Sequence, residues 1–172
     1  MEKYLYIALF APLVSSLFAA LFTATPKKTF VGIIASSLIF LAFVSSYMLL
    51  THILNGGDPV HVEMMTWMAT GNLYIPFGFI VDEVSVTMMM VVTLVSTVVH
   101  IYSIGYMDHD KGFNRFFSYL SAFVFSMMIL VMSDNFAGLF IGWEGVGLCS
   151  WGLIGFWYHK ESATWAANEA LL

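Results

Sequence analysis

Five long apolar stretches limit the folds that this sequence can adopt. They cover about residues 4–25, 29–53, 84–106, 114–133 and 136–158. Each approaches the roughly 20 residues that a helix needs to cross the hydrocarbon core of a bilayer. We therefore predict an all-α polytopic membrane protein with about five transmembrane helices, in a single transmembrane domain over residues 1–172.

Composition excludes several other classes of protein. Of the 172 residues, 60% are hydrophobic and only 10% are charged, which is not typical of a soluble globular domain. The 6 Lys and Arg residues are too few to solvate a water-facing exterior or to form a basic patch for nucleic acid. Cys149 is the single cysteine and the histidines lack ligand spacing, so we expect no disulfide, metal site or bound cofactor in this chain.

The segment between the second and third apolar stretches differs in kind. Over residues 62–81, aromatic and β-branched residues flank Thr70-Gly71-Asn72. This pattern predicts two short strands around a turn. Because Gly71, Asn72, Pro76 and Gly78 interrupt the run, a short external β-hairpin at the membrane surface fits better than another crossing.

Charged residues in the loops predict the orientation. Alternation of the loops places five cations on one face: Lys27, Lys28, Lys111, Arg115 and Lys160. The other face has Lys3 and the acidic Asp58, Glu63 and Asp134. Because cytoplasmic loops carry an excess of Lys and Arg, we expect the N-terminus and the hairpin outside. The expected location is the inner (plasma) membrane of a bacterium.

One carboxylate lies deep in the fifth apolar stretch. Glu144 has no other charge near it between Leu139 and Tyr158. It follows the predicted helix start by about eight residues, roughly 12 Å along the helix. An acidic residue in mid-membrane costs about 2.5–3.5 kcal/mol, so it must be protonated, paired or in a wet cavity. We predict that Glu144 is a proton carrier whose affinity a partner charge adjusts. The alternative is a neutral glutamate satisfied by a neighbouring helix.

The partner charge of Glu144 is not expected in these spans. Every Lys and Arg falls in a loop or at the end of a span. A cation that tunes this carboxylate must therefore come from residues beyond Leu172 or from another subunit.

Small residues recur at spacings of three and four along the same stretch. They are Gly138, Gly142, Gly145, Cys149, Gly152 and Gly155. Small side chains let neighbouring helix backbones approach closely in a membrane. We therefore predict that Gly142, Gly145 and Cys149 have a structural role in packing around Glu144.

The third stretch carries a polar stripe. Thr93, Ser96, Thr97, His100 and Ser103 recur at three and four residues. One interpretation is the wall of a hydrated half-channel with His100 as a proton relay, because imidazole titrates near neutral pH. In the other, the hydroxyls bond back to carbonyls one turn earlier and His100 lies at the membrane interface.

Two acidic residues are expected in structural roles at helix ends. Asp82 precedes Glu83 at the predicted start of the third helix, where acidic groups favour the free amides and the positive end of the dipole. Asp134 and Asn135 form the short external turn between the fourth and fifth helices, where a helix cap is again expected.

These residues carry a family resemblance. The block Gly142–Trp151, with its continuation over residues 153–158, is similar to the fifth-helix signature of the L subunits of bacterial NADH:quinone oxidoreductase, respiratory complex I. Matching segments lie upstream in the same order: Phe79–Asp82, Ser85–Met88, Val99–Tyr102, Tyr106–Met107, Arg115–Phe117 and Asp134–Asn135. The large subunit of multisubunit sodium/proton antiporters and membrane subunits of related hydrogenases share the signature.

The resemblance implies an antiporter-like, proton-translocating subunit of a respiratory oxidoreductase. It assigns the essential membrane glutamate to Glu144, and in the family a lysine on the seventh helix modulates that glutamate. FMN, iron–sulfur clusters and quinone would be bound by other subunits. The expected partners are the lipid bilayer and other membrane subunits, especially an adjacent antiporter-like one. A sodium/proton antiporter subunit and a purely structural membrane module remain the alternatives.

The C-terminal residues predict a truncated chain or an N-terminal fragment. From Ser162 a helical pattern begins and then stops at Leu172 without a capping residue. Where the family commonly has Lys before Ala-Phe at the start of the sixth helix, this chain has Glu169 before Ala170-Leu171.

Overall fold

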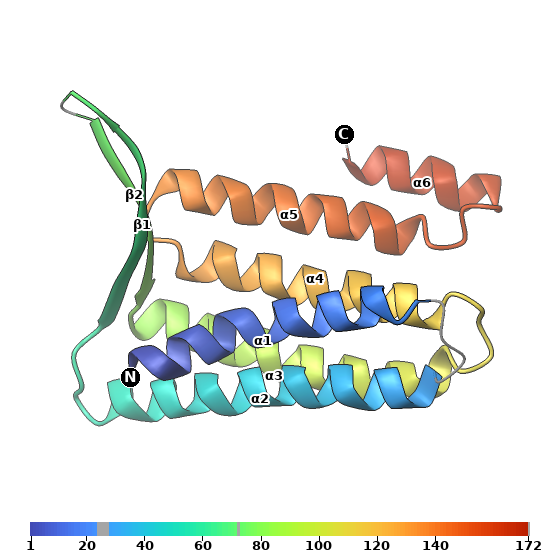
Figure 1. The fold of residues 1–172 in the computed structure, drawn as a ribbon, viewed down its shortest axis with the longest axis horizontal. Coiled ribbons are helices and arrows are strands. Elements are labelled where there is room, and N and C mark those ends of the chain that lie inside the picture. The colour runs from blue at the N-terminus through green and yellow to red at the C-terminus, as the bar shows by residue number, and fades with distance from the viewer. Residues whose placement is uncertain (24–27, 72, 172) are drawn as a thin grey trace.

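Six helices and one hairpin make up the part of the chain that the computed structural model describes, which is residues 1–23, 28–71 and 73–171 (Figure 1). The helices are α1 (Glu2–Leu21), α2 (Lys28–Leu54), α3 (Glu83–Tyr106), α4 (Phe113–Met132), α5 (Phe136–Ile154) and α6 (Glu161–Leu171). Among these residues, the five helices α1 to α5 are long and apolar enough to cross a membrane, judged by length and composition. A helix satisfies its own backbone hydrogen bonds, which lipid cannot do.

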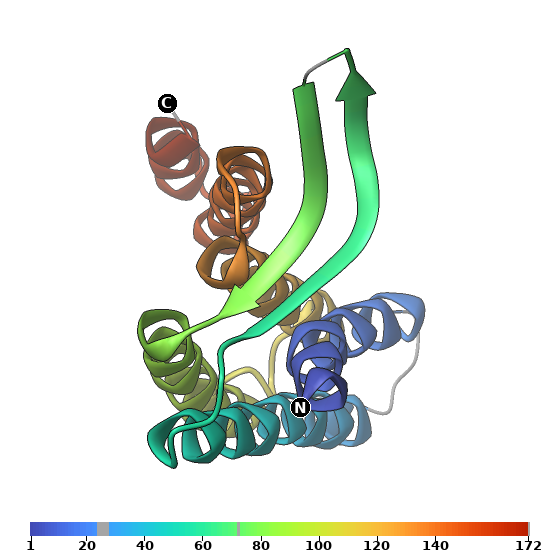
Figure 2. The same cartoon turned by 90° about the vertical axis from the view of Figure 1, so that its left-hand side faces the viewer.

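Helices α1 to α4 form a bundle in which each packs against its neighbours, and α5 packs on the outside of α4 (Figure 2). Helix α6 lies beside α5. Only 11% of the most apolar window of α5 is buried, against 33–44% in the other four spans. Helix α5 is therefore the least covered of the five.

The interior of the bundle has two apolar clusters. One lies towards the hairpin and includes Leu5, Leu9, Ile39, Leu49, Phe79, Met89, Met128 and Met132. The other lies at the opposite end and includes Met107, Phe113, Phe117 and Phe156. Side chains of all four bundle helices contribute, so the clusters hold these helices in a fixed arrangement.

A two-stranded antiparallel hairpin connects α2 to α3. Strand β1 (Val60–Thr70) pairs with β2 (Leu73–Val81), and Gly71 in the turn has a positive φ of 59°. Asn72, the third residue of the expected turn, lies outside the described residues, as do residues 24–27 between α1 and α2. The hairpin crosses the ends of the helices and its tip extends past the bundle (Figures 1 and 2). The predicted fold class, five apolar helices with a hairpin between the second and third, is confirmed.

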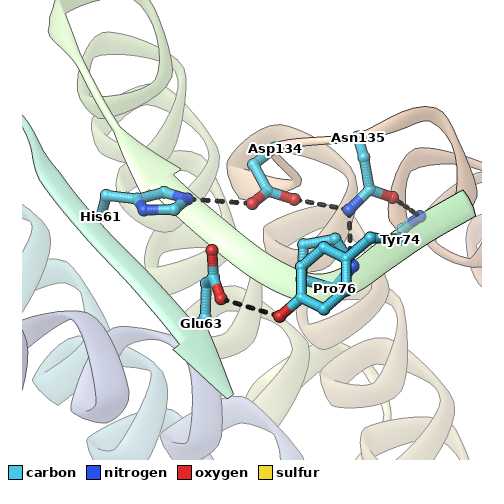
Figure 3. Close-up of polar contacts among 7 residues, drawn as sticks. His61, Glu63, Tyr74, Pro76, Asp134 and Asn135 are labelled. Atoms are coloured by element: carbon cyan, nitrogen blue, oxygen red, sulfur yellow. Dashed lines mark hydrogen bonds and ion pairs between the residues drawn. The ribbon is translucent and has the colours of Figure 1, made fainter. Parts of the chain in front are cut away.

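The base of the hairpin is joined to the turn between α4 and α5 (Figure 3). Phe79 of β2 forms a bridge with Ser133. His61 Nε2 lies 3.0 Å from Asp134 Oδ2, and Asn135 Nδ2 donates to the carbonyl of Pro76 at 2.7 Å. These contacts fix where α5 begins relative to the hairpin.

The cap of α5 is Asn135. Its Oδ1 accepts a hydrogen bond from the backbone N–H of Gly138 at 3.0 Å. Asp134 instead accepts from the Asn135 amide and pairs with His61. The sequence predicts a cap from Asp134 and Asn135, and Asn135 is the residue that caps the helix. Its side chain reaches the N–H of the third helical residue, Gly138.

Asp82 begins α3. Its Oδ1 accepts from the Ser85 backbone N–H at 2.8 Å, while the Ser85 hydroxyl accepts from the Asp82 backbone N–H at 2.8 Å. This reciprocal capping box satisfies two amides that otherwise have no partner within the helix. The hydrogen bond from Ser85 holds the pKa of the Asp82 carboxyl below its ordinary value of 3.8.

Replacement of the cap should destabilise α3. We expect Asp82→Ala to lower the free energy of unfolding by about 1 kcal/mol, because the Ser85 N–H loses its acceptor. Asp82→Asn keeps an acceptor and should stay near wild type. Thermal unfolding of the purified protein in detergent measures both, and an alanine variant as stable as wild type would contradict the role of the cap.

The same cap predicts a pH dependence. Since folding lowers the pKa of Asp82, its stabilising contribution is complete above the ordinary value of 3.8 and is lost as the pH falls further. Unfolding curves measured from neutral to acid pH should show a smaller acid loss in Asp82→Asn than in wild type. An equal loss in both proteins would mean that this carboxylate does not contribute.

Candidate functional site

Glu144 lies on the face of α5 that points away from the bundle. It is the only charged residue of this helix. Its side chain is exposed, and so are the large apolar side chains beside it: Phe140 by 61%, Trp143 by 66% and Leu148 by 62%. The carboxyl group therefore stands in an apolar surface of the least covered span.

No hydrogen bond or ion pair joins Glu144 to another residue within 1–23, 28–71 and 73–171. The one ion pair found among these residues, His61 with Asp134, lies at the hairpin end. The alternative prediction requires a hydrogen-bond partner on a neighbouring helix, and the described part of the chain contains none for this carboxyl group. In hydrocarbon such a group must be protonated, hydrated, or paired with something outside these residues.

Three glycines on another face of α5 bring it against α4. A Cβ added at Gly142 would lie 2.5 Å from the backbone nitrogen of Leu130. A Cβ at Gly145 would lie 2.6 Å from Ser126 Oγ, and one at Gly138 would lie 2.7 Å from Oγ of Ser133, the residue that follows α4. Since each helical residue turns by about 100°, Glu144 is directed away from this stripe. The glycines fix α5 on α4 and leave the carboxylate uncovered.

Cys149 continues the glycine stripe one turn further along α5. Its side chain is partly buried and lies near the Ser126 side chain of α4, which also faces Gly145. The thiol lies in the α4–α5 contact, on a different face from Glu144.

His100 lies inside the bundle and is fully buried. Its Nδ1 is 2.8 Å from the carbonyl oxygen of Ser96, one turn earlier on α3. Its Nε2 is 3.1 Å from Ser121 Oγ on α4, and the ring of Phe117 packs edge-on against the imidazole. Both ring nitrogens therefore have partners within the protein, and the ring is not exposed on the outside of the bundle.

Ser121 connects His100 to two further helices. Its Oγ lies 2.8 Å from Ser15 Oγ on α1, and Ser15 Oγ is 3.4 Å from the carbonyl oxygen of Ala35 on α2. Ser15 and Ser121 are both fully buried. Neither serine is among the residues that the sequence singles out, because an isolated serine in an apolar helix shows no pattern until its partner helix is known.

The hydroxyls of the predicted polar stripe on α3 bond back to their own helix. Thr93 donates to the Met89 carbonyl and Thr97 donates to the Thr93 carbonyl, both at 2.7 Å. These threonines follow the second interpretation of the stripe. The stripe therefore separates into self-satisfied threonines and one histidine that reaches across to α4.

Basic residues gather at the end of the bundle opposite the hairpin. Of the five cations that set the predicted orientation, four are described there, at the helix ends and loops: Lys28, Lys111, Arg115 and Lys160. Arg115 donates to the carbonyl of Phe156 at 3.1 Å and its guanidinium lies over the rings of Phe156 and Tyr158. Lys27 lies outside the described residues. None of the four described cations forms an ion pair with Glu144.

Helix α5 ends at Ile154, four residues before the end of the apolar stretch. Gly155 is its C-cap, and the residues after it turn towards the α3–α4 loop. There the Trp157 indole N–H donates to Asp110 Oδ2 at 2.9 Å. This hydrogen bond, with one from the Gly112 N–H, holds the pKa of the Asp110 carboxyl below its ordinary value.

Within residues 1–23, 28–71 and 73–171, no group of three or more His, Cys, Asp or Glu side chains is placed to hold a metal ion. His61 is engaged with Asp134, and His100 with Ser96 and Ser121.

The chain is similar to known membrane proteins. Residues 67–117 match the family model described as NADH-Ubiquinone oxidoreductase (complex I), chain 5 N-terminus. NADH-quinone oxidoreductase subunit L of Campylobacter jejuni subsp. jejuni is 54% identical over 173 residues, covering 100% of this chain and 28% of that protein. Subunit L of Neisseria meningitidis serogroup B is 45% identical over 100% of this chain and 26% of its own length. This chain thus spans about a quarter of these relatives.

A solved structure shares the fold. A chain from the structure of the membrane-bound sulfane sulfur reductase (MBS), an archaeal respiratory membrane complex, has a TM-score of 0.83 and 11% sequence identity. The match covers 97% of this chain and 33% of that chain. At this identity the similarity establishes the arrangement of helices alone. The family resemblance inferred from residues 142–151 is confirmed by the subunit L matches.

The glycine contact with α4 can be tested with a matched pair of substitutions. Gly142→Ala would place a methyl group against the Leu130 backbone, so we expect a loss of about 1–3 kcal/mol in unfolding free energy. Gly147 has no atom within 4 Å of an added Cβ. Gly147→Ala should therefore be neutral or stabilising by up to about 1 kcal/mol. Unfolding in detergent compares them, and equal stability of the two variants would contradict the packing role.

Proposed function

This chain matches the amino-terminal part of NADH-quinone oxidoreductase subunit L proteins, and from that relationship we propose that it is part of an antiporter-like membrane subunit. The subunit translocates protons while other subunits transfer electrons from NADH to quinone. Glu144 is the proton carrier. FMN, iron–sulfur clusters and quinone belong to the other subunits, so this chain contributes to a translocase without carrying out redox chemistry itself.

The position of Glu144 carries the proposal. The carboxyl group lies in the apolar surface of α5, where the neutral acid is the form tolerated by hydrocarbon. A cation brought near this surface favours the deprotonated form, and its withdrawal favours the neutral form. Movement of one charge outside the described residues therefore suffices to make Glu144 release or take up a proton.

The open face of α5 also suits a subunit of a larger assembly. Large apolar side chains surround Glu144 there, and the chain spans about a quarter of its relatives. We propose that further membrane helices, from the same subunit or from an adjacent antiporter-like one, cover this face and supply the cation. The glycine stripe keeps α5 fixed on α4 while that cation moves.

Replacement of the carboxylate tests this role. In the full-length subunit within its complex, Glu144→Gln should reduce proton translocation in inverted membrane vesicles at least severalfold, because an amide cannot carry a proton. Glu144→Asp keeps an ionisable group and should retain part of the pumping. NADH oxidation in the presence of an uncoupler reports whether the complex has assembled.

Glu161→Gln is the matched control. It makes the same chemical change in an exposed residue at the start of α6, outside the five spans. This variant should pump like wild type. Normal pumping by Glu144→Gln in an assembled complex would exclude Glu144 as the carrier.

We also propose that the hairpin faces the outside of a bacterial inner membrane and that the basic end faces the cytoplasm. Four cations described at one end support this orientation, since the hairpin end has Lys3 and the acidic Asp58, Glu63 and Asp134.

Cysteine labelling tests the orientation. In a Cys149→Ser background, Trp67→Cys on the exposed strand β1 should react in intact spheroplasts with a maleimide that cannot cross membranes. Lys111→Cys, in the exposed loop between α3 and α4, should react only after the membrane is permeabilised. The reverse pattern would contradict the proposed orientation.

A further inference from the structure

A continuous chain of hydrogen bonds crosses the interior of the bundle. It runs from the Ser96 carbonyl through His100 on α3 to Ser121 on α4, then to Ser15 on α1. It ends at the carbonyl of Ala35 on α2, 3.4 Å from Ser15 Oγ. All four helices of the bundle therefore contribute to one buried polar path.

When the imidazole is neutral, the protons available on the ring and the two hydroxyls determine which group donates in each hydrogen bond. The Ser96 carbonyl can only accept, so Nδ1 carries the proton and Nε2 has a free lone pair. The Ser121 hydroxyl must then donate to Nε2, and its oxygen accepts from Ser15. In this state the single proton of Ser15 is directed to Ser121 and not to the Ala35 carbonyl.

The order is reversed when the imidazole is protonated. Nε2–H then donates to Ser121, the Ser121 hydroxyl donates to Ser15, and Ser15 donates to the Ala35 carbonyl. Each serine then donates one hydrogen bond and accepts one, whereas in the neutral state Ser15 only donates. The same heavy-atom positions thus satisfy both charge states of His100, with only the two hydroxyl protons moved.

We propose that His100, Ser121 and Ser15 form a second proton-binding site in this chain, in which His100 takes up one proton and the two serines reverse their hydrogen bonds to accommodate it. The proton is taken from hydronium, leaving water, and is returned to water on release. No bond other than N–H and O–H bonds changes. His100 binds the proton, and Ser121 and Ser15 are positioning residues.

The hydrogen bonds of the two serines distinguish this role from simple helix packing. The groups that face the imidazole are the Ser96 carbonyl, the Phe117 ring and the Ser121 hydroxyl, and no described Asp, Glu, Lys or Arg bonds to it. Helix packing alone would be served by serines that bond back to their own helix, as Ser46 does to the Ala42 carbonyl. Ser121 bonds across helices to an imidazole, whose second ring nitrogen can bind a proton, and Ser15 bonds across helices to Ser121.

Helix α4 lies between this site and Glu144. Ser121 is on the face of α4 that meets α1 and α3, while Leu130 and Ser126 meet α5. The inference goes beyond the proposed function and does not depend on it, because its readout is the imidazole itself. Failure of the Glu144→Gln test would leave the second site standing.

The experiment is ¹⁵N solid-state NMR on the histidine side chains of the full-length subunit, in its complex in lipid, from about pH 8 down to the lowest pH at which the complex stays assembled, because burial disfavours the charged ring. His100→Gln identifies the signals by their loss. We expect a ring protonated at Nδ1 alone at the upper end of this range and at both nitrogens at the lower end. A ring that keeps one proton throughout would overturn the proposal.

Variants of the serine separate a proton-linked role from a packing role. Ser121→Ala removes the partner of Nε2 and should shift the Nε2 signal, whereas Ser121→Thr restores the hydroxyl and the wild-type signal. Ser46→Ala is the matched control, because Ser46 is equally buried but outside the path. Ser121→Ala should also change the pH at which the ring gains its second proton, and Ser46→Ala should leave that pH unchanged. An Nε2 signal or a protonation pH that Ser121→Ala leaves as in wild type would overturn the assignment.

Discussion

A polar group surrounded by hydrocarbon must find its partner inside the protein, and this requirement organises the whole bundle. Backbone groups meet it by forming helices. The threonines of α3 meet it by bonding to carbonyls one turn earlier. His100 meets it through Ser96 and Ser121. Glu144 is the exception, because the described residues offer it no partner, and that exception is what indicates its function.

Helix α4 is central to this arrangement. One face packs against α1 and α3 and carries the Ser121 contact with His100, while another receives the glycines of α5. Close packing of Gly142 on the Leu130 backbone leaves little freedom for α5 to move alone. The hairpin holds the turn between α4 and α5, because the Asn135 side chain donates to the carbonyl of Pro76. A charge moved near Glu144 therefore acts on a carboxyl group held in a defined position.

The sequence was sufficient for features that depend on local pattern. Apolar stretches of about 20 residues predict the spans because bilayer thickness sets their length. Residues either side of Gly71 predict the hairpin because the turn interrupts two β-rich segments. Contacts between distant segments could not be predicted. Asp134 was expected at a cap but pairs with His61. Ser121, the partner of His100, lies 21 residues away on another helix. Such contacts depend on how each helix is rotated about its axis relative to its neighbours, and a single sequence does not show this rotation.

Infrared difference spectroscopy of the whole complex tests the central claim most directly, because it detects the protonation of a carboxyl group itself. Spectra recorded before and after NADH is added should show a change in a carboxylic C=O band that shifts in D₂O. The account predicts that this change disappears in Glu144→Gln and persists in Glu161→Gln. An identical change in both variants would show that Glu144 keeps its protonation state during turnover, which contradicts its role as the proton carrier.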